Sequence, residues 1–331
     1  MRLVRLLARR SASSLLVIVL IALSLFAIFF ILPTDPAQLS CGRPCTPDQL
    51  AQVKRFMDLD QPWPAQFWAY LSGIAVGRTF GDGPAAIHCA APCFGYSFRL
   101  RESVTDLIAS RFPVTASIAL GAAVLWLLIG VATGVWSALN RGRWVDRTIL
   151  AASVVGVSTP AYLAGLLAIG IFALTLPIFP SGGYVPLAED PAGWAGHLLL
   201  PWLVLAVLSA ASYTRITRSQ MVTALSEDYI RTARSKGMPE RTVVGRHALR
   251  NAVLPVVTIF GLDLGGLLGG AVLTERVFSM QGLGALLLDA VANLDLQVLV
   301  GVTLFAACLI ILANLVVDVA YTLVDPRVRR S

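Results

Sequence analysis

Between Arg111 and Arg141 the chain reads FPVTASIALGAAVLWLLIGVATGVWSALN, residues 112–140, without one charged side chain. A helix needs about 20 consecutive, mostly apolar residues to cross the hydrocarbon core of a bilayer. The apolar residues of this stretch follow one another without the alternation of period two that a membrane β-barrel strand requires. The stretch therefore predicts a helix that spans a membrane.

Five further stretches have the same character. They lie at residues 15–32, in the first part of the uncharged segment 148–188, between Asp190 and Arg215, at 251–274 and at 296–318. Pro177, Pro180, Gly182 and Gly183 are expected to end the third stretch, and Asp263 interrupts the fifth. The pattern predicts an all-α integral membrane protein with six transmembrane helices and a large loop after the first.

The composition excludes other classes of protein. Of the 331 residues, 56% are hydrophobic and 14% are charged, whereas a soluble domain carries about 25% charged residues because its surface must be hydrated. A disordered chain needs low hydrophobicity and a high net charge. Neither a single soluble domain nor a disordered chain fits these values.

The distribution of charge predicts the orientation in the membrane. If the N-terminus is cytoplasmic, the inner segments are the N-terminal tail, 140–147, 215–250 and the tail from 325. These segments hold 18 Lys and Arg and five acidic residues, whereas the outer segments hold eight basic and 12 acidic residues. Because positive residues favour the cytoplasmic side, we expect both termini inside. The net charge of +7 then reflects membrane insertion, and nucleic acid is not expected as a partner.

The chain divides into three predicted regions. Residues 1–32 form the N-terminal tail and first helix, 33–111 form an external loop or small subdomain, and 112–331 form a five-helix core with a cytoplasmic loop at 219–250. A cleaved signal peptide is the alternative for the first helix, but its apolar run is long and no A-x-A site follows. An uncleaved helix is the interpretation that we adopt.

The external segment 33–111 holds four of the five cysteines: Cys41, Cys45, Cys89 and Cys93. An even number of cysteines on the oxidising side of a membrane predicts two disulfides, in any of three pairings. The alternative is a metal site in which His88 joins Cys89 and Cys93, although this spacing matches no zinc pattern well.

Aromatic residues and prolines concentrate in the middle of the external segment: Trp63, Pro64, Phe67, Trp68 and Tyr70. They could pack this segment into a compact subdomain. They could equally rest at the membrane–water interface, where Trp and Tyr are enriched.

No arrangement of residues indicates covalent catalysis. The two lysines, Lys54 and Lys236, are not followed by Ser or Thr as in a phosphate-binding P-loop. The three histidines are far apart, and neither an HExxH pair nor a GxSxG motif occurs. We expect no enzymatic activity, no cofactor and no metal site in this chain.

Asp263 is the candidate for a polar path through the membrane, because ionisable residues inside spans are rare and usually functional. Two alternatives are a carboxylic acid that stays neutral and one that is hydrogen-bonded to a neighbouring helix. Glycines beside it, Gly261, Gly265, Gly266, Gly269 and Gly270, would allow another helix to approach closely.

The segment Ser226-Glu-Asp-Tyr-Ile-Arg-Thr-Ala-Arg-Ser-Lys-Gly-Met-Pro239 predicts a short cytoplasmic helix. Ser226 is a plausible N-cap, Gly237 suits the turn after the helix, and Pro239 can open the next helix. Tyr229, Ile230 and Ala233 would share one apolar face. A helix of this kind fits a groove on a partner protein.

This segment, together with Arg246–Pro255, resembles the EAA-type coupling loop of ABC importer permeases of the oligopeptide/dipeptide/nickel subfamily. Further similar motifs lie at 113–116, 156–160, 197–201, 275–278, 282–284 and 314–327. The resemblance covers most of the chain, from Tyr96 to Arg330, and the long loop after the first helix is similar to that of the dipeptide permease B subunit.

The resemblance implies a type I importer permease in the inner membrane of a bacterium. It would pair with a homologous second permease, two cytoplasmic ATPases that hold ATP and Mg²⁺, and an external substrate-binding protein. The expected cargo is a peptide, with nickel chelates, haem or sugars as alternatives. A secondary transporter that works alone is the alternative from another class, and co-purification with ATPases separates the two.

The resemblance also implies roles for single residues. The coupling residues would be Asp228, Tyr229, Ile230, Arg231, Thr232, Ala233, Arg234, Lys236 and Gly237. Of these, Tyr229, Ile230 and Ala233 would fill the ATPase groove, Arg231 and Arg234 would pair with its rim, and Gly237 would form the turn. Asp263 and the cysteine-bearing insert depart from the family pattern, and both bear on the choice of substrate.

Overall fold

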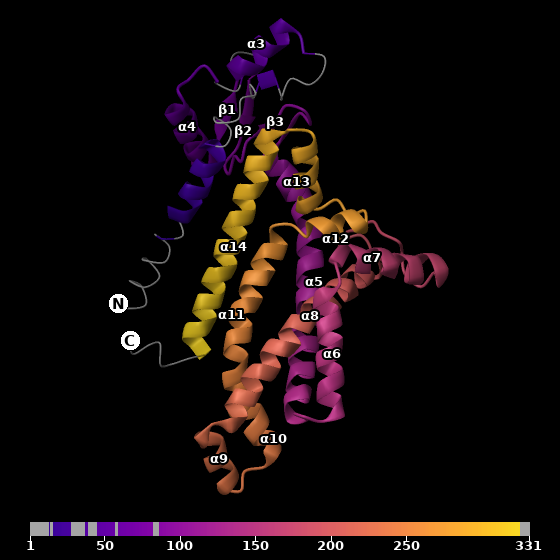
Figure 1. The fold of residues 1–331 in the computed structure, drawn as a ribbon. Helices are drawn as coiled ribbons and strands as arrows, with labels where there is room; N and C mark the ends of the chain where they lie inside the picture. Colours follow the sequence, from indigo (N-terminus) through magenta and orange to yellow (C-terminus); the bar gives the residue numbers. More distant parts are fainter. Residues whose placement is uncertain are drawn as a thin grey trace. The chain divides into compact units, whose positions relative to one another are not determined.

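The structure is a computed structural model that describes residues 13, 16–27, 37–38, 45–56, 59–81 and 86–324, with side chains as far as Val317. Helices make up most of it (Figure 1). The labelled helices are α3 (Pro47–Phe56), α4 (Trp63–Val76), α5 (Val104–Leu139), α6 (Trp144–Ser158), α7 (Ala161–Ile169), α8 (Pro191–Ser226), α9 (Asp228–Ser235), α10 (Glu240–Thr242), α11 (Leu249–Leu268), α12 (Val272–Val277), α13 (Leu283–Ala292) and α14 (Leu296–Val324). Two π-helical segments, η2 (Gly170–Thr175) and η3 (Val243–Ala248), continue α7 and join α10 to α11.

Four helices of the described chain are long and apolar enough to span a membrane. They are α5, α8, the continuous helix Glu240–Leu268 and α14. Helix α6 and the α7–η2 helix pass the same test as a pair, which would make five spans. The all-α membrane class is confirmed. The predicted first span is described only as the helix Leu16–Ala27, and the rest of 15–32 lies outside the described residues.

The third predicted span is not one straight helix. Its two halves meet at an angle of 98° between Ser158 and Ala161. Thr159 has an extended backbone, with φ −83° and ψ 123°. The residue before a proline avoids the helical region, and Pro160 has no N–H to donate to the preceding turn. The Thr-Pro pair therefore breaks the helix.

The fifth span ends earlier than predicted. The sequence suggested a helix over 251–274, but α11 stops at Leu268 and α12 begins at Val272. Gly270 between them has φ +141°, which an L-residue with a side chain rarely adopts. The glycines at the end of this stretch thus form a break between two helices.

Contacts divide the chain into two compact units. Unit 1 comprises Met1–Thr115, Leu268–Val272 and Gln281–Ile311, and unit 2 comprises Ala116–Leu267, Leu273–Met280 and Leu312–Ser331. Their boundary falls within α5 and α14, so these two helices contribute residues to both. The predicted core 112–331 is thus divided between them.

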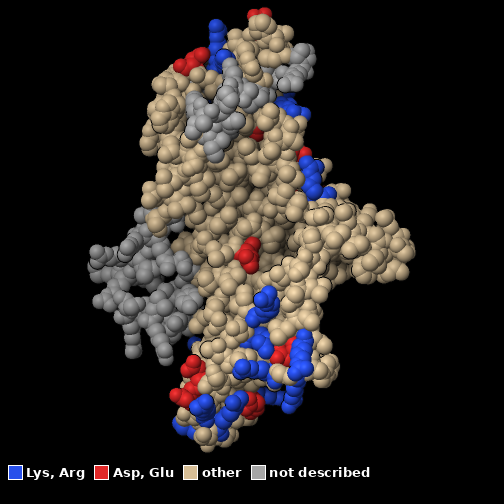
Figure 2. Space-filling view, in the orientation of Figure 1, with Lys and Arg blue, Asp and Glu red and all other residues tan. Residues whose placement is uncertain are grey.

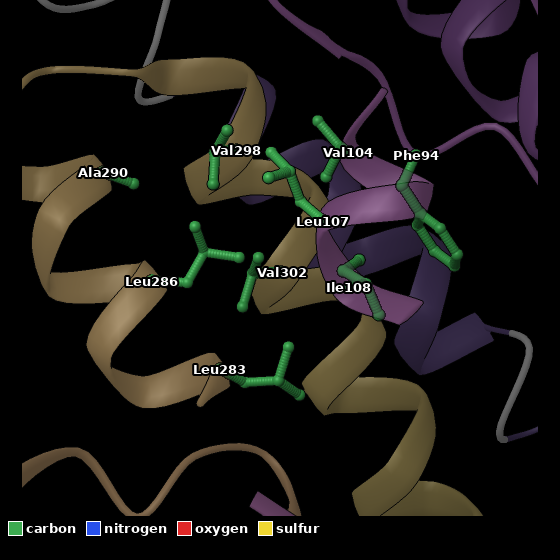
Figure 3. Close-up of a cluster of buried hydrophobic side chains, with 9 residues drawn as sticks. All are labelled: Phe94, Val104, Leu107, Ile108, Leu283, Leu286, Ala290, Val298 and Val302. Atoms are coloured by element: carbon green, nitrogen blue, oxygen red, sulfur yellow. The ribbon is translucent and has the colours of Figure 1, made fainter. Parts of the chain in front are cut away.

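One apolar cluster forms the centre of unit 1. Its members come from the start of α5, from α13, from α14 and from the loop before α5, and Figure 3 shows their side chains: Phe94, Val104, Leu107, Ile108, Leu283, Leu286, Ala290, Val298 and Val302. The rings of Phe94 and Phe112 pack edge-on against Phe305, at 5.9 and 5.5 Å between centroids. The start of α5, α13 and α14 are therefore held together by apolar packing.

The predicted external region forms a small mixed subdomain within unit 1. Strand β1 (Arg78–Phe80) pairs antiparallel with β2 (Ile87–Cys89), and β3 (Tyr96–Ser97) pairs with β4 (Glu102–Ser103). An aromatic group that includes Phe56, Phe80 and Tyr96 packs beside these strands. Aromatic residues of the region thus build a small core.

A disulfide joins Cys89 to Cys93 in this subdomain, with 5.6 Å between the two Cα atoms. It removes both cysteines from the alternative metal site, and Nδ1 of His88 instead lies 3.2 Å from the hydroxyl of Thr79. Cys45 is also disulfide-bonded, and Cys41 lies outside the described residues.

Unit 2 depends on close approaches of α5 and α8. A Cβ at Gly130 would lie 2.5 Å from Cβ of Tyr213, and one at Gly134 would lie 2.6 Å from Cβ of Thr217. Beside this contact, Trp126 and Tyr213 pack with alanines of both helices and with Val256 of α11. Small residues on membrane helices allow this approach, and it brings α5, α8 and α11 into one cluster.

The glycines of α11 supply a test of packing within unit 2. A Cβ at Gly261 would lie 1.8 Å from Cγ2 of Val317, whereas one at Gly266 would meet nothing within 4 Å. We expect Gly261→Ala to destabilise the protein by about 1–3 kcal/mol through overpacking. The matched variant Gly266→Ala should leave the thermal unfolding midpoint in detergent unchanged. Equal midpoints for both variants would contradict the packing described for α11.

Candidate functional site

Helix α9 is the segment that the sequence marked for binding a partner. It follows α8 after a single extended residue, Glu227, with φ −69° and ψ 149°. The predicted N-cap is wrong, because Ser226 is the last residue of α8 and its hydroxyl donates to the carbonyl of Thr223 at 2.7 Å. Glu227 occupies the N-cap position without a side-chain hydrogen bond.

The end of α9 has the geometry of a Schellman motif. The N–H of Gly237 donates to the carbonyl of Arg234 at 2.9 Å, and that of Met238 donates to the carbonyl of Ala233 at 3.3 Å. Gly237 has φ +74°, the left-handed conformation that this motif requires and glycine adopts at little cost. Met238 packs against the cluster that contains Ala233. The turn lies where the sequence placed it.

An ion pair closes the same turn on the outside. The guanidinium of Arg234 donates to both carboxylate oxygens of Glu240, from Nε at 3.1 Å and from Nη2 at 2.6 Å. These hydrogen bonds raise the pKa of Arg234 above its usual value. The two residues lie on either side of Gly237, so the pair joins the end of α9 to the start of α10. Arg234, expected at the rim of a partner, is thus engaged within the chain.

The apolar face of α9 is buried in unit 2. Ile230 and Ala233 pack among residues of α5, α8, η3 and α11: Ala138, Met221, Ala224, Val243, Ala248 and Ala252. Ile230 has no solvent-exposed surface. The sequence analysis placed these side chains in a groove on an ATPase, but in the structure other helices of this chain already cover them.

The outward face of α9 is polar and charged. Asp228, Arg231, Thr232 and Lys236 are exposed, and Asp228 and Arg231 form a solvent-exposed pair at 3.5 Å. Tyr229 is half-exposed, and its hydroxyl accepts a hydrogen bond from Nδ2 of Asn251 at 2.9 Å. Figure 2 shows basic and acidic side chains gathered at the end of unit 2 that carries α9 and α10.

A buried ion pair lies close to this end of the unit, and the sequence analysis missed it. Asp146 of α6 is 3% exposed and accepts hydrogen bonds from Nε and Nη2 of Arg218 in α8, at 2.6 and 2.7 Å. It also accepts from the hydroxyl of Ser137 at 2.6 Å and from the N–H of Gly142 at 2.9 Å. Asp146 therefore joins the end of α5, the following turn, α6 and α8. In the sequence, Asp146 is an acidic residue in a short basic turn. No neighbouring residue indicates that it pairs with Arg218, which is 72 residues away.

Asp263, the candidate for a polar path, lies on α11 and is exposed. Its Oδ2 accepts a hydrogen bond from the hydroxyl of Tyr213 in α8 at 2.8 Å. The alternative in which the carboxylate bonds to a neighbouring helix is thus realised, while the residue keeps an accessible surface.

A groove of about 470 Å³ lies along one face of α8. It is lined by residues at helical spacing, four of them polar: Ser212, Arg215, Ile216, Ser219 and Gln220. Of these residues, only Ser212 lies in the predicted fourth span, and the others belong to the predicted cytoplasmic segment 215–250. The sequence did not reveal the groove.

Comparisons with known proteins identify the class of molecule. Residues 130–330 match the family model described as binding-protein-dependent transport system inner membrane component, and residues 3–119 match the model for the N-terminal part of such membrane components. A protein of Brucella abortus named as a peptide transport system permease is 37% identical over 324 residues, 98% of each chain. The glutathione transport system permease protein GsiC of Salmonella choleraesuis is 38% identical over 312 residues, 94% of each chain.

The fold also has a counterpart among solved structures. A chain of the MetNI methionine ABC transporter, solved in inward-facing conformations, matches with a TM-score of 0.53 and 18% sequence identity. The match covers 67% of this chain and 97% of that chain. At this identity the likeness concerns the fold alone.

The ion pair at Asp146 yields a stability prediction. Asp146→Asn leaves the partly buried Arg218 without a counter-charge, and breaking a buried pair costs about 3–5 kcal/mol. We expect a clear drop in the thermal unfolding midpoint of the purified protein. Asp228→Asn is the matched control, because its exposed pair with Arg231 contributes about 1 kcal/mol or less.

A double replacement separates the pair from the fold as a whole. Asp146→Leu combined with Arg218→Met removes both charges, and a well-packed apolar pair often replaces a buried ion pair without loss. The double variant should be more stable than either single variant. Losses that simply add would show that the two side chains do not depend on each other.

Proposed function

The chain belongs to the family of binding-protein-dependent transport system inner membrane components, and from this premise we propose how it works within an ABC importer. It is an integral membrane permease subunit. We infer that it forms half of a translocation path for peptides and couples that path to a cytoplasmic ATPase. Peptide cargo is supported by the relatives named for peptide and glutathione transport, and those names give no support to nickel chelates, haem or sugars.

The attachment of α9 carries the proposal. Ile230 and Ala233 pack at once against α5, α8, η3 and α11. A displacement of α9 by an ATPase would therefore move the helices on both sides of it in the sequence, α8 and the helix Glu240–Leu268. The π-helical segment η3 lies at the start of that second helix, and such segments are frequent at functional positions.

The contact surface for the ATPase in this proposal is the outward face of α9, formed by Asp228, Tyr229, Arg231, Thr232 and Lys236. These side chains are exposed. Arg234 acts differently from the expectation that it pairs with the rim of the partner, because it holds the turn through Glu240. Gly237 forms the turn, as expected. ATP and Mg²⁺ would be bound by the ATPase subunits and not by this chain.

The remaining assembly follows from the charge distribution and the family. The distribution of basic residues supports a cytoplasmic location for both termini and for α9. The subdomain within 33–111 would then face outward, where a substrate-binding protein would deliver cargo. A homologous second permease would supply the other half of the path. Alternating access would then be a switch between two packings of the spans, biased by the ATPases.

We place the polar path along Asp263 and the grooved face of α8. Ser212 lies near the end of the predicted fourth span, and Arg215 and Ser219 follow it on the same helix at the start of the predicted cytoplasmic segment 215–250. This polar face of α8 would therefore lead from the span toward the cytoplasm. The hydrogen bond from Tyr213 sets the side chain of Asp263 beside α8. A water-filled path bounded by the second permease would hydrate both groups.

The turn at Gly237 tests coupling. Gly237→Val places a β-branched residue at φ +74°, which costs an L-residue about 1–2 kcal/mol, whereas its Cβ would meet nothing within 4 Å. We expect at least about a tenfold loss of ATP-driven transport, since about 1.4 kcal/mol is a factor of ten, with normal membrane insertion. The measurement is uptake of a radiolabelled peptide into proteoliposomes that contain the whole complex, with ATP hydrolysis followed in parallel.

The control is Gly196→Val, since Gly196 in α8 also has open space around its Cβ but no left-handed backbone and lies outside the coupling segments. It should keep transport within about twofold, the range expected where no strain is introduced. Equal effects of the two variants would refute the role of the turn. Uptake by the permease without any ATPase would refute the importer itself.

The path makes a separate prediction at Asp263. Asp263→Asn should lower peptide uptake while ATP hydrolysis still responds to the loaded binding protein, because the change removes a charge from the path and leaves α9 intact. Tyr213→Phe is the companion variant that keeps the carboxylate and removes its hydrogen bond. Full uptake by Asp263→Asn would remove Asp263 from the path.

A further inference from the structure

Helix α4 (Trp63–Val76) is apolar along its whole length. Its sequence, WPAQFWAYLSGIAV, contains no charged residue, while Asp60 and Arg78 flank it. Its 14 residues extend about 21 Å at 1.5 Å per residue, too short to cross a hydrocarbon core of about 30 Å. An apolar helix of this length is a core helix or an interfacial one.

The inner face of α4 packs on two other helices of unit 1. The rings of Phe67 and Tyr70 lie 5.6 and 5.5 Å from the ring of Phe26, in the helix Leu16–Ala27. The same side chains cluster with Val300 and Leu304 of α14. These contacts hold α4 against a helix that is long enough to span the membrane and against the described part of the predicted first span.

The outer face of α4 is uncovered in the structure. Trp68 is 65% exposed and Val76 is 80% exposed, and both lie on the side of the helix opposite the buried Phe67 and Tyr70. Trp63 is 53% exposed as the first residue of the helix, but it lies on the side of Phe67 and Tyr70. The two polar side chains of the helix are satisfied by the chain itself: Ser72 donates to the carbonyl of Ala69 at 3.3 Å, and the buried Gln66 donates to the carbonyl of Gln61 at 2.8 Å. On this face, the indole N–H of Trp68 is the side-chain group that still needs a hydrogen bond from water.

The helix beside α4 presents the same kind of surface. In the helix Leu16–Ala27, the exposed apolar side chains include Leu16, Val17 and Leu20. On a membrane helix, such side chains contact lipid. The exposed face of α4 is therefore held next to a lipid-facing surface through Phe67 and Tyr70. Tryptophan suits the membrane–water interface, because its ring prefers an apolar environment and its N–H can donate a hydrogen bond to water.

We propose that α4 lies along the membrane–water interface, with Trp68 and Val76 in contact with lipid. The occupant of the exposed face is thus the bilayer, and neither the substrate-binding protein nor the second permease. The helix runs directly into β1 through Gly77, where an added Cβ would lie 2.8 Å from the carbonyl oxygen of Cys89. The lipid-bound helix consequently fixes the disulfide-bonded hairpin at the membrane surface.

Collision measurements on a spin label test the proposal in the intact complex. A nitroxide is attached to Trp68→Cys in a Cys308→Ala background, without reductant, and the complex is placed in phosphatidylcholine nanodiscs. Oxygen concentrates in lipid and a nickel chelate in water. The oxygen-to-nickel collision ratio at position 68 should approach that of Leu128→Cys, on the exposed face of α5, and exceed severalfold that of Gln52→Cys, on the exposed face of α3.

Three results would overturn the proposal. A ratio at position 68 equal to that at position 52 means that the face is in water. Protection from both reagents in the complex alone means that another subunit covers it, and protection that appears only with the substrate-binding protein means that this protein docks there.

A second measurement needs no label. Brominated phosphatidylcholine should quench less of the total tryptophan fluorescence in Trp68→Phe than in the wild type, because an accessible ring is lost. The control Trp126→Phe removes a fully buried ring and should not lower the quenched fraction. Equal quenching in Trp68→Phe and the wild type would also overturn the proposal.

Discussion

The arrangement of the helices around α9 depends on the ion pair between Asp146 and Arg218. Burial of a carboxylate is costly, and the cost is offset only when its oxygens are fully hydrogen-bonded. Asp146 receives four such bonds, from Arg218, Ser137 and the N–H of Gly142. The pair therefore fixes the C-terminal half of α8 against α5 and α6. Because α9 follows α8 after one residue, the pair also sets where α9 begins.

The burial of Ile230 and Ala233 has a simple physical reason. A helix of eight residues has too few hydrogen bonds to form alone in water, so α9 needs tertiary packing. Its apolar side chains supply that packing, the Schellman turn satisfies its last carbonyls, and Arg234–Glu240 ties the turn to the next helix. In the proposed importer, an ATPase would therefore meet a helix that is already formed, and a force on α9 would pass into unit 2 instead of unwinding the helix.

The sequence predicted best what depends on neighbouring residues. The apolar runs identified the spans, and Gly237 identified the turn after α9, because each signal is local. The break between Thr159 and Ala161 was also local, since a proline stands in it, but the length of the uncharged segment concealed it.

The missed features depend on residues that are far apart in the chain. The ion pair of Asp146 with Arg218 joins positions 72 residues apart. The cover over Ile230 comes from α5, α8 and η3. The aromatic residues of α4 were predicted either to pack into a compact subdomain or to lie at the membrane–water interface. In the structure they divide, since Phe67 and Tyr70 are buried whereas Trp63 and Trp68 are exposed. Composition alone cannot predict which of these residues are buried and which are exposed, because this depends on which helices pack against α4.

The polar residues of the long helices in unit 2 fall into two groups, and the difference supports the proposed path. Some are satisfied inside the unit: Thr133 bonds to Thr214 at 2.7 Å, and Trp202 donates to the carbonyl of Ser117 at 2.9 Å. Such bonds join helices and need no water. The side chains of Ser212, Arg215 and Ser219 instead line an open groove. Arg215 stands where the predicted fourth span meets the cytoplasmic segment 215–250, and its guanidinium needs water or another protein beside it rather than lipid. The second permease and the aqueous path that we propose would supply both.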